Sequence, residues 1–320
     1  MIVGNKITDL QYRYIEDVLM EVDGIGKSTA ARIISTKNSF RELQRIVDDD
    51  ISDIRGITDR KSDKIVGKIT DIDFDKTIEA LYTEKILKNF LDNQYKKVEN
   101  IELDDLNINV LLIKALGFTT VEETIEFYIY QRITRSAVTS WGQGALEDIC
   151  LISGAEEVPR SENVDVGGKR FDMKRQKGDK TYYIQLKSGP NTMNIGMVDS
   201  LNKMIEKIEQ QNPNSVGMLG MTYGDRSQVS SQITGNLNDF DEKSVIGSEF
   251  WEFLTEQEDY FSELIFIISG LSEEYEDRYA NDYLDLVENK KQELITQWKQ
   301  QYGTDTDGTL DDFIQEYTTA

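Results

Sequence analysis

The sequence predicts an α/β (α+β) fold, in which a mixed β-sheet flanked by helices lies between an all-α N-terminal domain and a helical C-terminal part. Three observations predict it. A helix–turn–helix pattern occurs twice near the N-terminus, strand-like segments gather around one helix in the middle, and helical periodicity returns towards the C-terminus. The 320 residues suffice for two or three modest domains.

The N-terminal pattern is an internal repeat. Residues 22–34 align with residues 54–66 at an offset of 32 positions. In each copy we expect one helix to end at a Gly-Ile turn and a second helix to begin immediately afterwards. Gly24 and Gly56 suit a left-handed turn residue, and the isoleucine that follows each of them would fill the base of the hairpin. Backbone N–H groups beside a helix N-terminus can bind a phosphate.

This repeat resembles the tandem helix-hairpin-helix domain of DNA repair proteins and nucleases, over about residues 8–72. The second copy departs from the family pattern at Thr58 and Ser62, where Gly and Ala are usual. The resemblance implies that both turns contact the DNA backbone, and an alternative is a structural repeat used for protein contacts. The implied DNA-binding residues are Gly24, Ile25, Gly26, Lys27, Ser28, Gly56, Thr58, Arg60 and Lys61.

The later elements follow from periodicity and breaker residues. Helices are expected in 76–120, at 121–139 and, after the glycines of 141–144 interrupt the chain, at 145–152. Strands are expected at 163–167, 170–175, 181–187 and 215–221, with a helix at 197–211, and further helices at 248–268, 272–301 and 309–317. The domains are therefore predicted as 1–75, 76–120 (a helical connector), 121–238 (the sheet-containing core) and 239–320.

A polar set lies at one end of the predicted central hairpin. Asp172 is on one strand, and Gln185-Leu-Lys187 is on the next. Because side chains alternate along a strand, Gln185 and Lys187 share a face with Tyr183. A carboxylate, an amide oxygen and an ammonium together can hold a divalent metal ion against a phosphodiester and position a water molecule.

This set, with Gly144-Ala-Leu-Glu147 before it, resembles the PD-(D/E)xK nuclease core over about residues 122–222, and most resembles type II restriction endonucleases. The resemblance implies that Glu147 and Asp172 ligate Mg²⁺, for which Mn²⁺ can substitute. We expect the Leu186 carbonyl to join them and Lys187 to orient the attacking water or to neutralise developing charge. Gln185 stands where the family usually has an acid, so it is expected to be a weaker ligand.

Two loops could contact DNA near this site. Ser188, Asn191, Thr192 and Asn194 follow the lysine strand, either as DNA contacts or as caps of the next helix. In the loop after the strand at 215–221, Arg226 and Gln228 are residue types that read guanine and adenine edges. Asp165 is a further candidate acid.

Composition narrows the chemistry. The chain has no histidine, which excludes histidine-based general bases and histidine zinc sites, and the single Cys150 excludes disulfide frameworks. We expect a cytoplasmic protein with no membrane segment. The net charge of −23 is concentrated at residues 239–320, which have 22 acidic and 5 basic residues, whereas residues 160–190 have 8 basic and 4 acidic residues. The region of the polar set is thus locally basic.

These resemblances imply a Mg²⁺-dependent type II restriction endonuclease that cuts double-stranded DNA at a short sequence and leaves 5′-phosphates. A homodimer is expected because a palindrome has two equivalent strands, and a cognate DNA methyltransferase is expected in the cell, not as a bound subunit. Two alternatives remain: a structure-selective DNA repair or junction nuclease, and a non-catalytic DNA-binding protein on a degenerate nuclease core.

Overall fold

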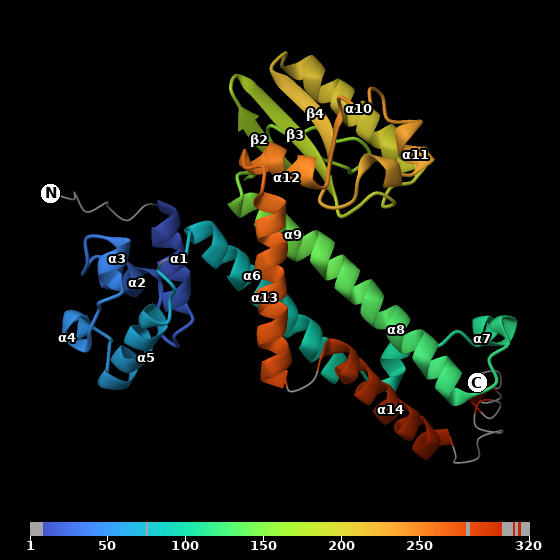
Figure 1. Cartoon of the computed structure of the whole chain (residues 1–320), viewed down its shortest axis with the longest axis horizontal. Coiled ribbons are helices and arrows are strands. Elements are labelled where there is room, and N and C mark those ends of the chain that lie inside the picture. The colour runs from blue at the N-terminus through green and yellow to red at the C-terminus, as the bar shows by residue number, and fades with distance from the viewer. Residues whose placement is uncertain (1–8, 75, 280–281, 303–309, 311–312, 315–320) are drawn as a thin grey trace. The chain divides into compact units, whose positions relative to one another are not determined.

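A computed structural model describes residues 9–74, 76–279, 282–302, 310 and 313–314 of the chain. The chain divides into two compact units, Met1–Lys85 and Ile86–Ala320, whose elements are shown in Figure 1. Each unit contains hydrophobic clusters of its own. None of the helices in the described part of the chain has a stretch long and apolar enough to cross a bilayer.

The N-terminal unit is helical. Its elements are α1 (Asp9–Met20), α2 (Lys27–Ile34), α3 (Phe40–Leu43), α4 (Asp48–Ile51), α5 (Asp59–Thr70) and the start of α6 (Ile78–Glu99). Apolar residues at helical spacing turn inward, so that Ile15, Leu19, Ile33, Ile65 and Ile69 form a fully buried core. Helix α1 contacts both α2 and α5.

The two turns of the repeat have the same backbone geometry. Gly24 and Gly56 have φ values of +76° and +95°, in the left-handed region that favours glycine. In the first turn the Ile25 N–H donates to the Val22 carbonyl at 3.0 Å, and the corresponding bond in the second turn joins Ile57 to Ile54 at 3.1 Å. Each copy therefore leads from one helix into the next through a turn of the expected kind.

The second unit contains a mixed sheet, as the sequence predicted, and this sheet has five strands. Its strands, in spatial order, are β1 (Glu156–Glu157), β2 (Met173–Lys177), β3 (Lys180–Lys187), β4 (Ser215–Met221) and β5 (Ser244–Ile246). Strand β2 runs antiparallel to both β1 and β3, whereas β3, β4 and β5 are parallel to one another. Helix α10 (Ile195–Gln211) makes the crossover between β3 and β4.

Helices cover both faces of this sheet. On one face, Tyr183 of β3 belongs to a core with Val198 and Leu201 of α10. On the other face, Ile184 and Leu186 pack into a core formed with α9 (Leu146–Ile152), α12 (Ser248–Thr255) and α13 (Tyr260–Tyr279). The alternation along β3 thus sends its polar residues to the α10 side and its aliphatic residues to the α9 side.

A separate apolar cluster lies in the same unit. Helices α7 (Val110–Leu116), α8 (Val121–Ser140) and α14 (Tyr283–Tyr302), with the 3₁₀ turn η1 (Leu103–Leu106), bury residues such as Ile129, Leu294 and Trp298. Helix α8 begins at a capping box, in which Thr120 accepts from the Glu123 N–H and the Glu123 carboxylate accepts from the Thr120 N–H.

The predicted strand at 163–167 is wrong. Gly167 and Gly168 have φ values of +63° and +82°, so the chain turns back at this point, and Val166 and Lys169 pair as an isolated bridge. The three-residue strand β5 and the two-residue strand β1 were not predicted, because so few residues show no alternation.

The glycines of 141–144 do not end the helical path. Residues Trp141–Ala145 form the π-helical turn η2, in which the Leu146 N–H donates to the Trp141 carbonyl, and α8 leads through it into α9. The predicted helix 248–268 is divided at Glu256, whose φ is +63°. The break expected before residue 272 is absent, because α13 continues to Tyr279. Most of the helix predicted at 309–317 falls outside the described residues.

Candidate active site

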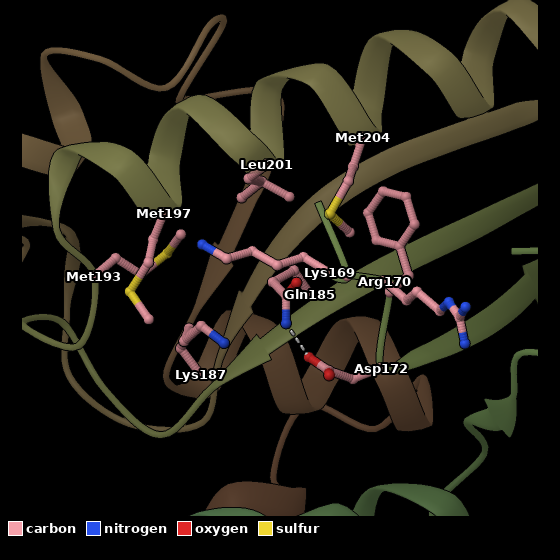
Figure 2. Close-up of a pocket in the computed structure, with 11 residues that line it drawn as sticks. Lys169, Arg170, Asp172, Gln185, Lys187, Met193, Met197, Leu201 and Met204 are labelled. Atoms are coloured by element: carbon pink, nitrogen blue, oxygen red, sulfur yellow. Dashed lines mark hydrogen bonds between the residues drawn. The ribbon is translucent and has the colours of Figure 1, made fainter. Parts of the chain in front are cut away.

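Asp172 and Gln185 meet where β2 begins and β3 approaches its end. The Asp172 N–H donates to the Ile184 carbonyl at 3.0 Å, which aligns the two segments. Atom Oδ2 of Asp172 accepts hydrogen bonds from the Leu186 N–H, at 2.6 Å, and from the Gln185 side-chain amide. Figure 2 shows this contact at one side of the pocket, with Lys187 nearby. The structure therefore brings together Asp172, Gln185 and Lys187, as the sequence predicted, but the strand expected at 170–175 is β2 at Met173–Lys177, so that Asp172 lies one residue before it.

The environment shifts the pKa values of Asp172 and Lys187 towards neutrality. Burial raises the pKa of Asp172 above its ordinary value, although the charge of Lys187 and the hydrogen bonds to Leu186 and Gln185 oppose the shift. Burial lowers the pKa of Lys187, against the attraction of Asp172 and with the help of the positive charge of Lys169. Lys187 can therefore give up a proton more readily than a surface lysine can.

Glu147 approaches the same carboxylate from α9. Its side chain is half-buried, and burial raises its pKa, followed in effect by the negative charges of Asp172, Asp148 and Glu157. The predicted helix acid is thus within electrostatic reach of Asp172. It does not line the pocket on the α10 side of the sheet, where Gln185 and Lys187 lie.

That pocket has a volume of about 400 Å³. Asp172, Gln185 and Lys187 belong to its polar part, and helix α10 supplies an apolar wall of Met197, Leu201 and Met204 (Figure 2). It is also lined by Gly168, Lys169, Arg170, Phe171 and Met193. Lys169 was not among the predicted site residues. The locally basic stretch 160–190 was the available signal, but it does not single out one lysine.

The donor set fits a hard divalent cation. Carboxylate, amide and backbone carbonyl oxygens are the ligands that Mg²⁺ and Ca²⁺ prefer. Both hydrogen bonds to the Asp172 carboxylate go to Oδ2, and Oδ1 accepts none from the described residues. In the described part of the chain no group of three His, Cys, Asp or Glu residues could hold a metal ion. A third ligand at this site would therefore be the Gln185 amide or a backbone carbonyl.

The loop after β3 is held by internal hydrogen bonds. Asn194 Oδ1 accepts from the Met197 N–H at 3.0 Å and caps α10, as the structural alternative proposed. The Thr192 hydroxyl donates to the Gly189 carbonyl at 2.7 Å, and the Ser188 carbonyl accepts from Thr222 at 2.9 Å. Asn191 is exposed. Of the four predicted contacts, Asn191 and the Ser188 hydroxyl have no internal hydrogen bond among the described residues.

Arg226 and Gln228 are engaged within the protein. The Arg226 guanidinium donates to the Ser244 carbonyl at 3.0 Å, to the Ser244 hydroxyl at 3.1 Å and to Glu249 at 3.0 Å. The Gln228 side-chain oxygen accepts from the Asp225 N–H at 3.0 Å. Both side chains fix the loop after β4, and this geometry does not favour the base-reading role predicted for them.

The turns of the N-terminal unit leave helix ends open. Neither α2 nor α5 has a side-chain hydrogen bond to its first N–H groups, although the N–H groups of Thr29 and Lys61 donate to the backbone carbonyls of Gly26 and Thr58. The predicted residues Gly24, Gly26, Lys27, Ser28, Gly56, Thr58 and Arg60 are exposed. Ile25 is buried and can offer only its backbone, and the Lys61 ammonium donates to the Gly56 carbonyl at 3.5 Å.

Comparison with known families gives one match. Residues 76–276, more than half of the chain, match the family model described as "Type II restriction endonuclease EcoO109I". The matched segment runs from α6 to α13 and contains Glu147, Asp172 and Lys187. It leaves out the N-terminal repeat. A comparison with curated proteins found no match.

Proposed function

This chain belongs to the family described as type II restriction endonuclease EcoO109I, and from that membership we propose a Mg²⁺-dependent enzyme that cuts both strands of DNA at a short specific sequence and leaves 5′-phosphates. Membership in the family means a DNA-cleaving hydrolase. The observation that supports the proposed chemistry is the meeting of Asp172, Gln185 and Lys187 at one end of β3, with Glu147 in electrostatic reach.

The residues of the site would have different roles in hydrolysis. Asp172, Glu147 and the Leu186 carbonyl would hold Mg²⁺, with Gln185 as a neutral fourth donor, and the ion would supply a Lewis acid and a bound water of lowered pKa. Lys187 lies beside Asp172 with a lowered pKa. It would orient the attacking water or neutralise charge on a phosphoryl oxygen. Water oxygen bonds to phosphorus as the bond to the 3′-oxygen breaks, which leaves a 3′-hydroxyl and a 5′-phosphate.

The proposed role of the Gln185 amide as a metal ligand can be tested through the affinity of the enzyme for Mg²⁺. Gln185→Glu should lower the Mg²⁺ concentration needed for half-maximal cleavage by about tenfold or more, because it adds an anionic oxygen ligand beside Asp172. The measurement is cleavage rate against Mg²⁺ concentration. Gln176→Glu, on the exposed part of β2, is the control and should leave this concentration unchanged. An unchanged requirement in Gln185→Glu would mean that residue 185 is not a ligand.

We propose that the N-terminal unit is a tandem helix-hairpin-helix module that grips the DNA backbone. Its support is the shared geometry of the turns at Gly24 and Gly56, the uncapped helix ends behind them and the exposed cations Lys27 and Arg60. First-turn N–H groups and nearby cations together favour a phosphate.

Replacing both Lys27 and Arg60 with glutamine should weaken DNA binding by a similar factor for duplexes of different sequence. Two lost phosphate contacts lower the slope of log affinity against log salt by about 1.8. Fluorescence anisotropy at several salt concentrations measures it, with Lys27→Gln/Arg60→Gln compared with Lys68→Gln, whose ammonium pairs with Glu21 at 2.7 Å. Equal slopes in the wild type, the double variant and Lys68→Gln would favour the structural role for the repeat.

We further propose that the enzyme acts as a homodimer in the cytoplasm, beside a methyltransferase that protects the host sequence. The decisive experiment is digestion of phage DNA with Mg²⁺ at low salt, followed by sequencing of the fragment ends. Discrete fragments with 5′-phosphates support restriction, cleavage confined to branched DNA supports a repair nuclease, and intact DNA rejects the enzyme. The last outcome would favour a degenerate core, for which Gln185 is the supporting residue.

A further inference from the structure

We propose that Lys169 binds a phosphate of the DNA strand being cut, as a second cation beside Lys187. The proposal rests on the proposed nuclease function and adds a substrate-binding residue to it. Lys169 lines the same pocket as Asp172, Gln185 and Lys187. Figure 2 shows its side chain extending through the pocket, between Gln185 and the α10 wall.

The backbone holds Lys169 in place. Val166 and Lys169 exchange two backbone hydrogen bonds, of 3.0 and 3.2 Å, across the Gly167-Gly168 turn. Asp165 stiffens the turn further, because its carboxylate accepts from the Gly168 N–H at 2.9 Å and its carbonyl accepts from Lys207 of α10 at 3.1 Å. These hydrogen bonds hold the turn in place and thereby fix the position of the Lys169 backbone beside the pocket.

Lys169 has no anionic partner among the residues that the structure describes, whereas its neighbour Arg170 does. The Arg170 guanidinium forms an ion pair with Asp165 at 2.8 Å and also donates to it through Nε at 2.9 Å. Among the described residues no carboxylate forms an ion pair with Lys169 or with Lys187. With Arg170 neutralised by Asp165, the pocket carries two unpaired ammonium groups and one carboxylate, that of Asp172.

Because the pocket has more ammonium groups than carboxylates, an anion is the ligand that would balance its charge. The two ammonium groups are close enough for the charge of Lys169 to lower the pKa of Lys187. The α10 wall is built of methionine and leucine side chains and offers no compensating charge. A phosphodiester placed at Asp172 and Lys187 would supply the missing negative charge, and it is the anion that a DNA-cutting enzyme must hold there.

The test compares Lys169→Gln with Arg170→Gln, a change of the neighbouring but paired cation. Binding is followed by anisotropy at several salt concentrations, with Ca²⁺ in place of Mg²⁺, on a duplex that carries the sequence cut by the wild-type protein. Lys169→Gln should lower the salt slope by about 0.9, the value for one lost phosphate contact, and should slow cleavage. Arg170→Gln should keep the wild-type slope, and Lys169→Arg should restore it.

The outcomes separate this inference from the proposed function. If the wild-type protein cuts DNA and Lys169→Gln keeps both the slope and the cleavage rate, the phosphate contact is refuted and the nuclease remains. Equal losses of slope in Lys169→Gln and Arg170→Gln also refute it, because the effect is then one of surface charge. If the wild-type protein neither cuts nor binds DNA, both proposals fail. Melting temperatures of the variants identify any loss caused by misfolding.

Discussion

Asp172→Asn is expected to reduce DNA cleavage by about 10³-fold or more while the protein stays folded. The carboxylate is the strongest oxygen ligand on the strand pair, and an amide of the same shape carries no charge to hold the metal ion or to oppose Lys187. Initial rates of plasmid linearisation with saturating Mg²⁺ measure the effect. Asp179→Asn is the matched control, because Asp179 is exposed in the turn between β2 and β3.

The same substitution should change stability in a direction that depends on pH. Burial raises the pKa of Asp172 above its ordinary value of 3.8. Between that value and the raised pKa, the folded protein binds more protons than the unfolded chain does, so the free energy of unfolding falls as pH increases through this window and stays lower above it. Asp172→Asn should therefore melt at a higher temperature than the wild type at neutral pH.

That gain should disappear below about pH 3.8, where Asp172 is protonated in both folded and unfolded states. Calorimetry at neutral and acidic pH checks it. A variant that cuts DNA at the wild-type rate, or that melts at a lower temperature at neutral pH, would contradict the assigned position and role of Asp172.

Lys187→Met is expected to slow cleavage by about 10²- to 10³-fold and to leave Mg²⁺ affinity nearly unchanged. Methionine keeps an unbranched side chain, one atom shorter than that of lysine, but has no ammonium to orient water or to neutralise phosphoryl charge. Single-turnover rates separate this step from DNA binding. Lys180→Met, on the exposed start of the same strand, is the control. Wild-type cleavage by Lys187→Met would remove the lysine from the mechanism.

The candidate site was predictable where residues of the right chemical type also alternate along a strand. Seven alternating residues at 181–187 place Gln185 and Lys187 on the α10 face, and this placement needs no knowledge of the rest of the fold. The link between Asp172 and β3 was predictable because a Gly-Asp turn joins neighbouring strands. The polar residues around the end of β3 and the mixed sheet that carries them were therefore predictable from local sequence alone.

The missed features depend on contacts between distant segments. Lys169 lies between the strands predicted at 163–167 and 170–175. It lines the pocket because the chain folds back at Gly167 and Gly168 and because α10 packs on this side of the sheet. Arg226 was predicted to contact DNA bases, but its guanidinium donates hydrogen bonds to Ser244 of β5 and Glu249 of α12. Neither partner can be identified from local periodicity, since both meet Arg226 only after the sheet has formed.

The π-helical turn at Trp141–Ala145 has a consequence for the spacing of this chain. Such a turn accommodates one residue more than an α-helix would, and one residue corresponds to a rotation of about 100° around the helix axis. Glu147 lies two residues after this turn, so the direction of its side chain relative to Asp172 depends on how many residues precede it as well as on what they are. Deleting one residue from this glycine-containing stretch is expected to give a regular α-helix in which Glu147 points away from the carboxylate of Asp172.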